Sequence, residues 1–381
     1  MLHLTISTLT LSLSLVLSNA QGIQLPKPLG PFKIGTTSFE LTDHSRLDPF
    51  APTPQNRSVQ LSICYPIANG NSLPFSTYLP PLTTRALEMQ FGVPAGSIPN
   101  ISTRAHLNAP ILGGGQETPV ILYSPGFGNS RLIGTMFVQE LASEGYAVVS
   151  IDHPYDASIV ELSDGRVITA NISDSPEDIT RAIAVRAADA RFVLDELETG
   201  CDFKVPGLHK GLDTTRVGFF GHSLGGATAG TAMVLDSRIV AGVNMDGSFF
   251  GPDIQRGLTK PFVIMARKGH NRTTDSTWGE VWPKLRGFKR EIEIEGAEHG
   301  TFTDWPVLAD LFGVKSELED LVGTIAAQRV EKIQHAYLTA FFDFAVRGKK
   351  KEKLLDGPSK EFPEVTFASQ VWYGLYRSSS S

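Results

Sequence analysis

A series of short apolar runs, separated by helical segments, constrains this fold more than any other feature. A strand that is apolar at every position is expected to be buried on both faces, as in a parallel sheet. Helices between such strands cover both faces and supply the crossover connections. We expect strands at residues 59–67, 119–124, 147–152, 216–221, 238–245, 262–266 and 290–295.

The intervening segments carry helix signals. Ser175 is a predicted N-cap and Pro176 the first residue of a helix over 176–198, and both residue types favour helix initiation. Its apolar side chains recur every three or four residues and so share one face. We expect further helices over 131–146, 224–235 and 325–346, with a short one near 83–91. The pattern predicts one α/β domain with a mainly parallel sheet and helices on both faces.

Composition divides the rest of the chain. Residues 21–57 are proline-rich and are expected to be irregular, and the catalytic domain is expected to span 58–346 with insertions at about 68–117 and 153–177. Residues 347–381 form a tail with a basic run and a serine-rich end, and we interpret the basic run as solvated surface. No internal repeat or second domain is visible, although 381 residues would allow two domains.

Residues 1–20 have the pattern of a signal peptide. Residues 4–17 are an uncharged apolar run, and Ser18 and Ala20 place small residues before a cleavage point at Gln21. That run is shorter than the roughly 20 residues that span a bilayer, although an uncleaved anchor is the alternative. We therefore expect a secreted protein that has no transmembrane helix after the signal peptide is removed.

Glycosylation sequons and cysteines fit an oxidising compartment. Cys64 and Cys201 could form one disulfide there, or both could stay free and buried. N-x-[ST] sequons, which are N-glycosylation candidates in a secreted protein, occur at Asn56, Asn100, Asn171 and Asn271.

Composition also excludes several classes of function. The net charge is −6, from 34 basic and 40 acidic residues, which argues against nucleic-acid binding. Two cysteines are too few for a disulfide framework or a Cys₄ zinc site. We expect neither a metal nor an organic cofactor, and the oligomeric state stays open.

The strongest motif is Gly-His-Ser-Leu-Gly-Gly at 221–226, which matches G-x-S-x-G between a predicted strand and a predicted helix. In that context the motif is a nucleophile elbow, a strained turn that projects Ser223 from the top of the sheet in an α/β-hydrolase fold. The helix that follows favours negative charge near its N-terminus. We therefore expect Ser223 to be a nucleophile.

The serine needs a base, and the order in this fold is Ser, acid, His. His299 lies in the small-residue loop Gly-Ala-Glu-His-Gly after the last predicted strand, where its imidazole could reach Ser223. His270 lies beside a sequon and His335 lies inside a predicted helix. We therefore predict His299 as the base.

The acid is less tightly constrained. Asp246 follows the fourth strand of the alternating pattern, at the edge where sites of open α/β sheets gather. Asp275 follows the next strand, in a polar loop beside a sequon, and Asp304 is too close to His299 to fit the usual order. Position alone modestly favours Asp246 over Asp275 as the group that orients His299.

A glycine-rich loop, Ser-Pro-Gly-Phe-Gly at 124–128, follows the first strand of the alternating pattern. In this fold that loop and the residue after the nucleophile supply the two backbone N–H groups of the oxyanion hole. We assign these groups to Phe127 and Leu224. Gly126 and Gly128 would let the backbone approach the substrate closely.

Together these residues resemble the plasma-type platelet-activating factor acetylhydrolase family, also called group VII phospholipase A2. The resemblance spans roughly 57–345 and rests on segments 221–227, 126–128 and 147–153 and on the spacing of Ser223, Asp246 and His299. It implies Ser223 as nucleophile, Asp246 as acid and His299 as base, because that family places its acid on this earlier strand. The chain looks like a divergent secreted member of the kind found in fungi.

These features favour a secreted serine carboxylester hydrolase that acts through an acyl-enzyme. The resemblance implies short-chain acyl esters such as acetyl phospholipids. A general esterase, a cutinase-like polyester hydrolase or a lipase remain alternatives, as do a serine peptidase and, in another class, an inactive binding module. The aromatic residues near the proposed acid and base either line an acyl pocket or pack in the core, and they are Phe249, Phe250, Phe302 and Trp305.

Overall fold

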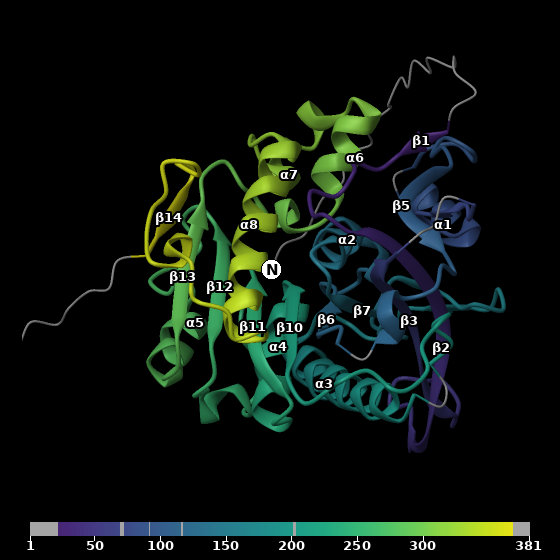
Figure 1. Cartoon of the computed structure of the whole chain (residues 1–381), viewed down its shortest axis with the longest axis horizontal. Helices are drawn as coiled ribbons and strands as arrows, with labels where there is room; N and C mark the ends of the chain where they lie inside the picture. The colour runs from purple at the N-terminus through teal and green to yellow at the C-terminus, as the bar shows by residue number, and fades with distance from the viewer. Residues whose placement is uncertain (1–21, 69–71, 91, 116, 201–202, 369–381) are drawn as a thin grey trace, which may run out of the picture.

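The protein is built on one large mixed sheet, described from a computed structural model over residues 22–68, 72–90, 92–115, 117–200 and 203–368. Twelve strands of these ranges form the sheet, in the order β1-β5-β2-β3-β7-β6-β10-β11-β12-β13-β14 with β4 beside β5 (Figure 1). The strands and a separate hairpin, β8–β9, are β1 Ile23–Gln24, β2 Lys33–Leu47, β3 Asn56–Ile67, β4 Phe75–Thr77, β5 Ile101–Leu107, β6 Val120–Ser124, β7 Ala147–Ile151, β8 Ile159–Glu161, β9 Val167–Thr169, β10 Val217–His222, β11 Ile239–Met245, β12 Phe262–Arg267, β13 Lys289–Ile294 and β14 Val365–Phe367.

The centre of the sheet is parallel, as the apolar runs predict. Strands β7, β6, β10, β11, β12 and β13 pair in parallel, and every residue of β6, β7 and β10 is buried. Their apolar side chains supply the sheet's contribution to the core on both faces. The predicted α/β class and the six central strands are confirmed.

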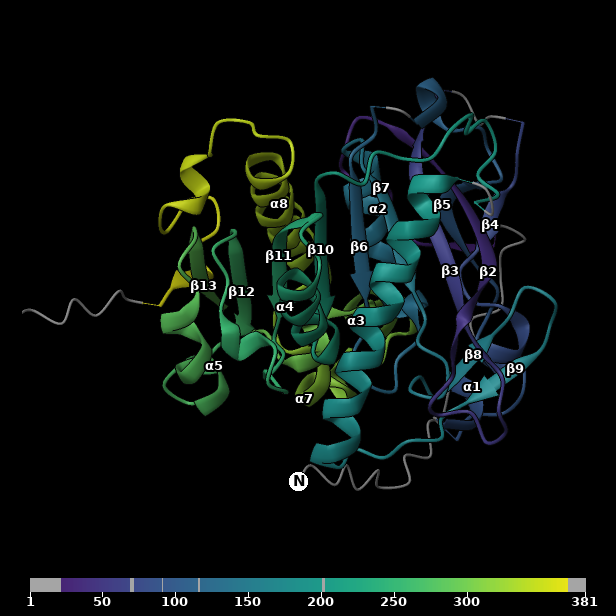
Figure 2. The same ribbon diagram turned by 90° about the horizontal axis from the view of Figure 1, so that it is seen from below.

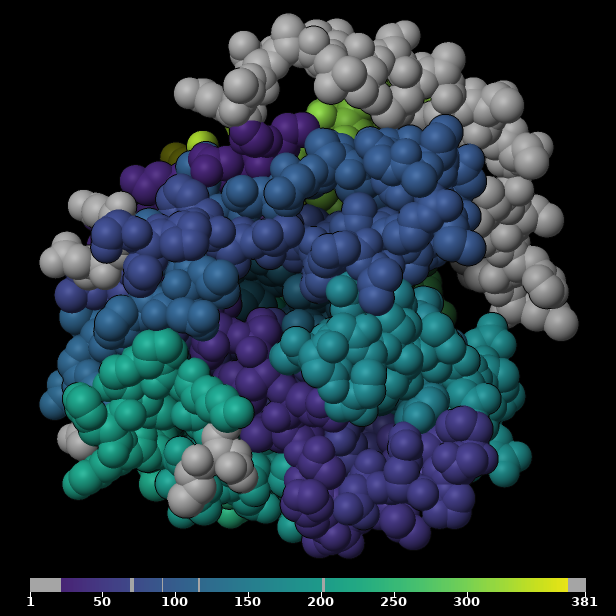
Figure 3. Space-filling model, turned by 90° about the vertical axis from the view of Figure 1, so that its right-hand side faces the viewer, coloured from purple at the N-terminus to yellow at the C-terminus, as the bar shows by residue number. Residues whose placement is uncertain are grey.

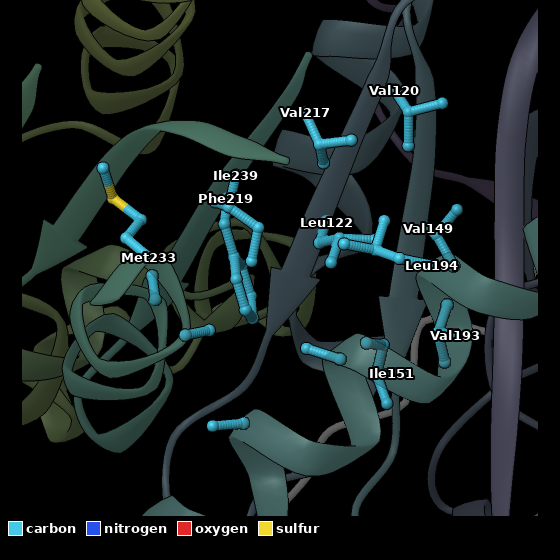
Figure 4. Packing of buried hydrophobic residues seen from close by; sticks show 14 of the residues in the cluster. Val120, Leu122, Val149, Ile151, Val193, Leu194, Val217, Phe219, Met233 and Ile239 are labelled. Carbon is cyan, nitrogen blue, oxygen red and sulfur yellow. The ribbon is translucent and has the colours of Figure 1, made fainter. Parts of the chain in front are cut away.

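Helices cover both faces of the sheet (Figures 1 and 2). Helices α3, α4 and α5 contribute to one buried cluster, and α2 and α8 contribute to the cluster on the opposite face. Figure 4 shows the first cluster, in which α3 residues Val193 and Leu194 pack against strand residues Leu122, Val149 and Phe219. The helices are α1 Pro81–Gln90, α2 Thr135–Ser143, α3 Pro176–Thr199, α4 Leu224–Leu235, α5 Ser276–Val281, α6 Trp305–Phe312, α7 Glu319–Val322 and α8 Ala327–Ala345, with 3₁₀ turns η2 Arg131–Gly134 and η5 His299–Phe302.

Helix α3 begins as its sequence predicts. The hydroxyl of Ser175 accepts a hydrogen bond from the backbone N–H of Asp178, and Pro176 occupies the first helical position. Gly200 ends the helix in the left-handed region, where a glycine is favoured. These signals place Arg186 and Asp189 in the buried part of the helix, three residues apart.

The prediction that residues 21–57 are irregular is wrong over most of that range. Strand β2 pairs antiparallel with β3 from Lys33 opposite Ile67 to Leu47 opposite Asn56. It is rich in Thr and Ser, so its sequence lacks a continuous apolar run, and prolines flank it on both sides. Pairing with β3 and β5 stabilises this strand where its own composition gives a weak signal.

The two predicted insertions also hold regular structure. The range 68–117 contains the expected short helix, α1, together with strands β4 and β5 that were not predicted. The range 153–177 contains the β8–β9 hairpin, and Glu161 of β8 accepts hydrogen bonds from Thr83 of α1. The space-filling view shows the two insertions side by side on one surface (Figure 3). The tail contributes β14, which pairs antiparallel with β13.

Candidate active site

Ser223 lies in the sharp turn between β10 and α4. Strand β10 ends at His222 and α4 begins at Leu224, so a single residue joins them. Its φ of 53° and ψ of −121° lie in a region that non-glycine residues rarely occupy, and such strain is concentrated at functional sites. The serine backbone is held by an N–H bond to the carbonyl oxygen of Met245 at 2.8 Å.

The glycines of the motif are required by close backbone contacts. A Cβ on Gly221 would lie 2.3 Å from the carbonyl carbon of Gly225, and a Cβ on Gly225 would lie 1.9 Å from the carbonyl oxygen of Ser124. A Cβ on Gly226 would lie 2.0 Å from Oδ1 of Asn244. The elbow therefore packs directly against β6 and β11, as the G-x-S-x-G pattern predicts.

Asp246 follows β11 and faces His299. Its Oδ2 lies 2.7 Å from Nδ1 of His299, and its side chain is buried. Burial opposes ionisation of Asp246, but hydrogen bonds with His270 and His299 outweigh it and lower the pKa of the carboxyl to about 2. A carboxylate so placed orients the imidazole and stabilises its charged form.

The turn that carries Asp246 packs against the nucleophile. Asp246 has a φ of 59°, and its N–H donates to the carbonyl oxygen of Met265 at 2.8 Å. A Cβ on the next residue, Gly247, would lie 1.9 Å from the carbonyl oxygen of Ser223. Acid and nucleophile are therefore fixed to each other through the backbone.

His299 begins the 3₁₀ turn η5, directly after the small-residue loop. Its side chain is 48% exposed, and its carbonyl oxygen accepts a hydrogen bond from Nε2 of His222 at 3.0 Å. The rings of His222 and His299 are 4.5 Å apart between centroids. Burial, and then the charge of His299, lower the pKa of His222 to about 3, so His222 is neutral. The residue that precedes the nucleophile thus anchors the loop of the predicted base.

Asp246 contacts two histidines, and the second occupies a different role. Nδ1 of His270 lies 2.7 Å from Oδ1 of Asp246, while its Nε2 lies 3.0 Å from Oδ2 of Asp275. With both nitrogens facing carboxylates, His270 has no nitrogen left for a serine. This favours His299 as the base and places Asp275, the alternative acid, on the far side of His270.

The loop predicted to form the oxyanion hole is held by α3. Arg186 donates through Nη1 to the carbonyl oxygen of Pro125 at 2.6 Å and through Nη2 to that of Gly126 at 3.3 Å. The same guanidinium forms two short hydrogen bonds with Asp156. Phe127 is half-buried in this loop, and Leu224 opens the first turn of α4. A bidentate, buried guanidinium is a rigid support for a glycine-containing loop.

A second Ser-His-Asp arrangement lies beneath that loop. Oγ of Ser124 is 2.9 Å from Nε2 of His153, and Nδ1 of His153 is 2.9 Å from Oδ2 of Asp189. Asp189 also accepts hydrogen bonds from Arg57 at 2.7 and 3.1 Å. All four side chains are buried, so this network supports the site from within the fold.

Comparison with known proteins identifies the family. A sequence model described as "Platelet-activating factor acetylhydrolase, isoform II" matches residues 17–173 and 178–360. A relative from Arthroderma benhamiae, named "Probable 1-alkyl-2-acetylglycerophosphocholine esterase", is 32% identical over 90% of this chain and 93% of its own length. The chain belongs to the platelet-activating factor acetylhydrolase family.

Further comparisons agree with this membership. The family's member from Cavia porcellus, "Platelet-activating factor acetylhydrolase", is 21% identical over 91% of this chain and 85% of its own. The solved "Ferulic acid esterase from Streptomyces cinnamoneus" superposes with a TM-score of 0.79 and 34% identity, covering 92% of this chain and 100% of that one. The α/β-hydrolase fold is thereby confirmed, and the chain is a carboxylic ester hydrolase.

The aromatic residues near the proposed acid and base differ in their burial. Phe249 and Phe302 are buried in the two main core clusters, and Phe250 and Trp305 pack against clusters as partly buried residues. The core-packing interpretation therefore holds for Phe249 and Phe302. Asp304 is buried and accepts hydrogen bonds from the N–H groups of Thr135 and Met136 at the start of α2.

Residues with modest sequence signals complete the site. From the sequence, His270 shows only a neighbouring sequon, and His153 ends a segment on which the resemblance rests. A polar cluster directly after a buried strand, Asp-His-Pro-Tyr-Asp at 152–156, was the available signal for the network. Arg186 and Asp189 lie on the buried face of α3, and a charged pair on an apolar helix face could also have indicated it.

One of the two cysteines and all four sequon asparagines lie within the described residues. The thiol of Cys64 is free and buried, with burial raising its pKa to about 11. Cys201 and residues 1–20 lie outside the described residues. Asn56, Asn100 and Asn171 are exposed, whereas Asn271 is half-buried with its amide 3.4 Å from Glu293. Within the described ranges, no cluster of three or more His, Cys, Asp or Glu residues could hold a metal ion.

Proposed function

We propose that this chain is a secreted serine esterase that removes short acyl groups, acetyl above all, from phospholipids through an acyl-enzyme on Ser223. The observation that carries the proposal is the 2.7 Å contact between Asp246 and His299 beside the strained serine. The name of the Arthroderma benhamiae relative supports the acetyl phospholipid substrate. The signal-peptide pattern of residues 1–20 supports secretion, and no helix of the described residues is long and apolar enough to cross a membrane.

The reaction begins with a proton transfer from Ser223. Because Nδ1 of His299 donates to the carboxylate of Asp246, its Nε2 carries the lone pair that a general base needs. Ser223 Oγ attacks the acyl carbonyl carbon while Nε2 accepts the hydroxyl proton. Asp246 stays ionised and stabilises the imidazolium that results.

The acyl-enzyme then forms and is hydrolysed. The N–H groups of Phe127 and Leu224 stabilise the oxyanion of each tetrahedral intermediate. When the first intermediate collapses, His299 returns its proton to the leaving alcohol and the C–O bond of the ester breaks. A water molecule then loses a proton to His299 and attacks the acyl carbon. When the second intermediate collapses, the bond between the acyl carbon and Oγ breaks and His299 returns the proton to Oγ, which releases the acid and regenerates Ser223.

Purified protein and a series of esters test this proposal. We expect an alkyl-phosphonate probe to label the wild type and not Ser223→Ala, and we expect acetyl-phospholipid turnover to exceed long-chain turnover. Equal rates on acetyl and long-chain esters would contradict the short-acyl specificity and favour a lipase or polyester hydrolase. Absence of labelling in folded wild type would favour a binding module.

Aromatic esters are a second candidate substrate class. The solved relative whose title names a ferulic acid esterase is 34% identical to this chain over nearly its whole length. Parallel assays with methyl ferulate and an acetyl phospholipid distinguish the two classes. A higher kcat/KM on methyl ferulate would replace the phospholipid proposal while leaving the serine mechanism in place.

A further inference from the structure

His270 occupies a position between two carboxylates that the mechanism above leaves unused. Its Nδ1 is 2.7 Å from Asp246 and its Nε2 is 3.0 Å from Asp275. An ionised carboxylate only accepts hydrogen bonds, so both ring nitrogens must carry a proton. A doubly protonated imidazole is a cation. Asp275, His270 and Asp246 therefore form a row of alternating charge that ends at His299.

The surroundings of His270 fix its ring. It stacks on Trp278 with centroids 4.2 Å apart and planes inclined by 26°. Trp278 is fully buried, and its Nε1 donates to the carbonyl oxygen of Gly247 at 2.7 Å. Asp275 is the N-cap of α5 and accepts the backbone N–H groups of Thr277 and Trp278. Hydrogen bonds thus hold Asp275 at one end of the row, and Trp278 supports the ring of His270.

We propose that His270 is a positioning residue that holds the carboxylate of Asp246 toward His299 and partly neutralises its charge. The inference rests on the proposed function, since it concerns the same acid and base. Oδ1 of Asp246 accepts hydrogen bonds from His270 and from the backbone N–H of Arg267, which leaves Oδ2 for His299. Asp275 acts on His299 only through this histidine.

Several charged groups on neighbouring elements face this cluster. Burial opposes a charge on His270, but the hydrogen bonds with Asp246 and Asp275 outweigh it and raise its pKa to about 9. Glu291 lies close enough for the charge of His270 to act on its carboxyl. The remaining groups are Arg267, which is 3.6 Å from Asp246, Arg272, which pairs with Glu291, and Glu293, which accepts the N–H of Gly269.

His270→Gln tests the proposal while it leaves those groups in place. We expect kcat on p-nitrophenyl acetate to fall between about 10-fold and 100-fold, because Asp246 loses its fixed orientation, with KM within about twofold of wild type. We also expect the acidic limb of the kcat/KM profile to move to higher pH. Without the neighbouring cation, the full negative charge of Asp246 faces the base, and a nearby negative charge favours the charged form of an imidazole.

A matched control is His44→Gln, which removes an exposed histidine of β2 and should leave both kcat and the profile unchanged. An unaltered kcat and profile in His270→Gln would overturn the proposal. Wild-type turnover and phosphonate labelling are measured first. An inactive, unlabelled wild type refutes the proposed function, whereas an active wild type with an indifferent His270→Gln refutes only this inference.

Two further measurements do not depend on that variant folding. In ¹⁵N-histidine NMR of the wild type near pH 7.5, we expect an imidazole with protons on both nitrogens besides that of His335, which also lies between two carboxylates. The signal of His270 is assigned by its perturbation in Asp275→Ser. The absence of a doubly protonated histidine that responds to Asp275→Ser would overturn the proposal. Asp275→Ser keeps a favourable N-cap residue but removes the carboxylate, so kcat should fall with KM unchanged. An unchanged kcat would contradict a role for the row.

Discussion

The molecule contains a proposed Ser-His-Asp triad and a buried Ser-His-Asp network, which have similar contacts between histidine and aspartate but different surroundings. Nδ1 of His299 is 2.7 Å from Asp246, and Nδ1 of His153 is 2.9 Å from Asp189. The side chain of His299 is 48% exposed, whereas that of His153 is 1% exposed. Exposure to solvent, and not the contact between histidine and aspartate, separates the proposed triad from the buried network.

The charged groups around His153 also favour a structural role for the buried network. Burial, and then the charge of Arg186, lower the pKa of His153, which disfavours the imidazolium that a general base must become. Burial opposes ionisation of Asp189, but Arg57 and His153 outweigh it and hold its pKa well below the usual range. The buried arrangement therefore behaves as a fixed ion-pair network. The backbone of the two serines differs as well. Ser223 has a positive φ, whereas Ser124 ends an ordinary strand.

The largest expected contrast is between Ser223→Ala and Ser124→Ala. We expect Ser223→Ala to lower kcat by at least about 10⁴-fold, because no other residue supplies the nucleophile. Ser124→Ala should lower kcat less than about tenfold and should chiefly lower the Tm, because His153 and Arg186 lose a buried partner. Steady-state kinetics and thermal melts of both variants check this. Equal losses of kcat would mean that the two serines are not functionally distinct.

The two aspartates sharpen the same contrast. Asp246→Asn should lower kcat by about 10⁴-fold, as expected when the base loses its orienting carboxylate. Asp189→Asn should lower the free energy of unfolding by about 3–5 kcal/mol, because Arg57 is left buried without a full counter-charge. Urea unfolding followed by kinetics on the folded protein separates the effects. A stable Asp189→Asn protein would contradict the structural role of the network.

Arg186 connects the two arrangements, because it contacts both Ser124 and the oxyanion loop. Arg186→Lys keeps the charge beside Asp156 but cannot reproduce the forked donors. We expect kcat to fall about 10-fold to 100-fold, because the N–H of Phe127 is no longer held in place. Affinity for a boronic-acid transition-state mimic should fall in parallel, while KM changes little. A normal inhibitor affinity would show that Arg186 does not support the loop.

The sequence predicts the turn at Ser223 and the pairing of Asp246 with His299 far better than the buried network. Ser223 lies in a local motif whose glycines are required by contacts within a few residues or with adjacent strands. The buried network joins β6, the turn after β7 and α3, so it depends on where distant segments meet. The role of His270 also depends on where distant segments meet, because its partners Asp246 and Asp275 follow different strands. Strand β2 was missed because pairing with β3, and not its own composition, stabilises it.

The smallest expected effect concerns the dependence of stability on pH near His270. Its pKa is raised to about 9 in the folded protein from an ordinary value of 6.5. The resulting stabilisation is complete below about pH 6.5 and is lost as the pH rises through about 9, to a limit of about 3 kcal/mol. The side chain of His335 has a pKa raised in the same direction, so the wild type alone does not isolate His270. The difference in unfolding free energy between wild type and His270→Gln should therefore shrink between pH 6.5 and 9. A constant difference across that range would contradict an imidazolium at His270, whereas a shrinking one would show that a cation lies beside Asp246, as Arg57 lies beside Asp189 in the buried network.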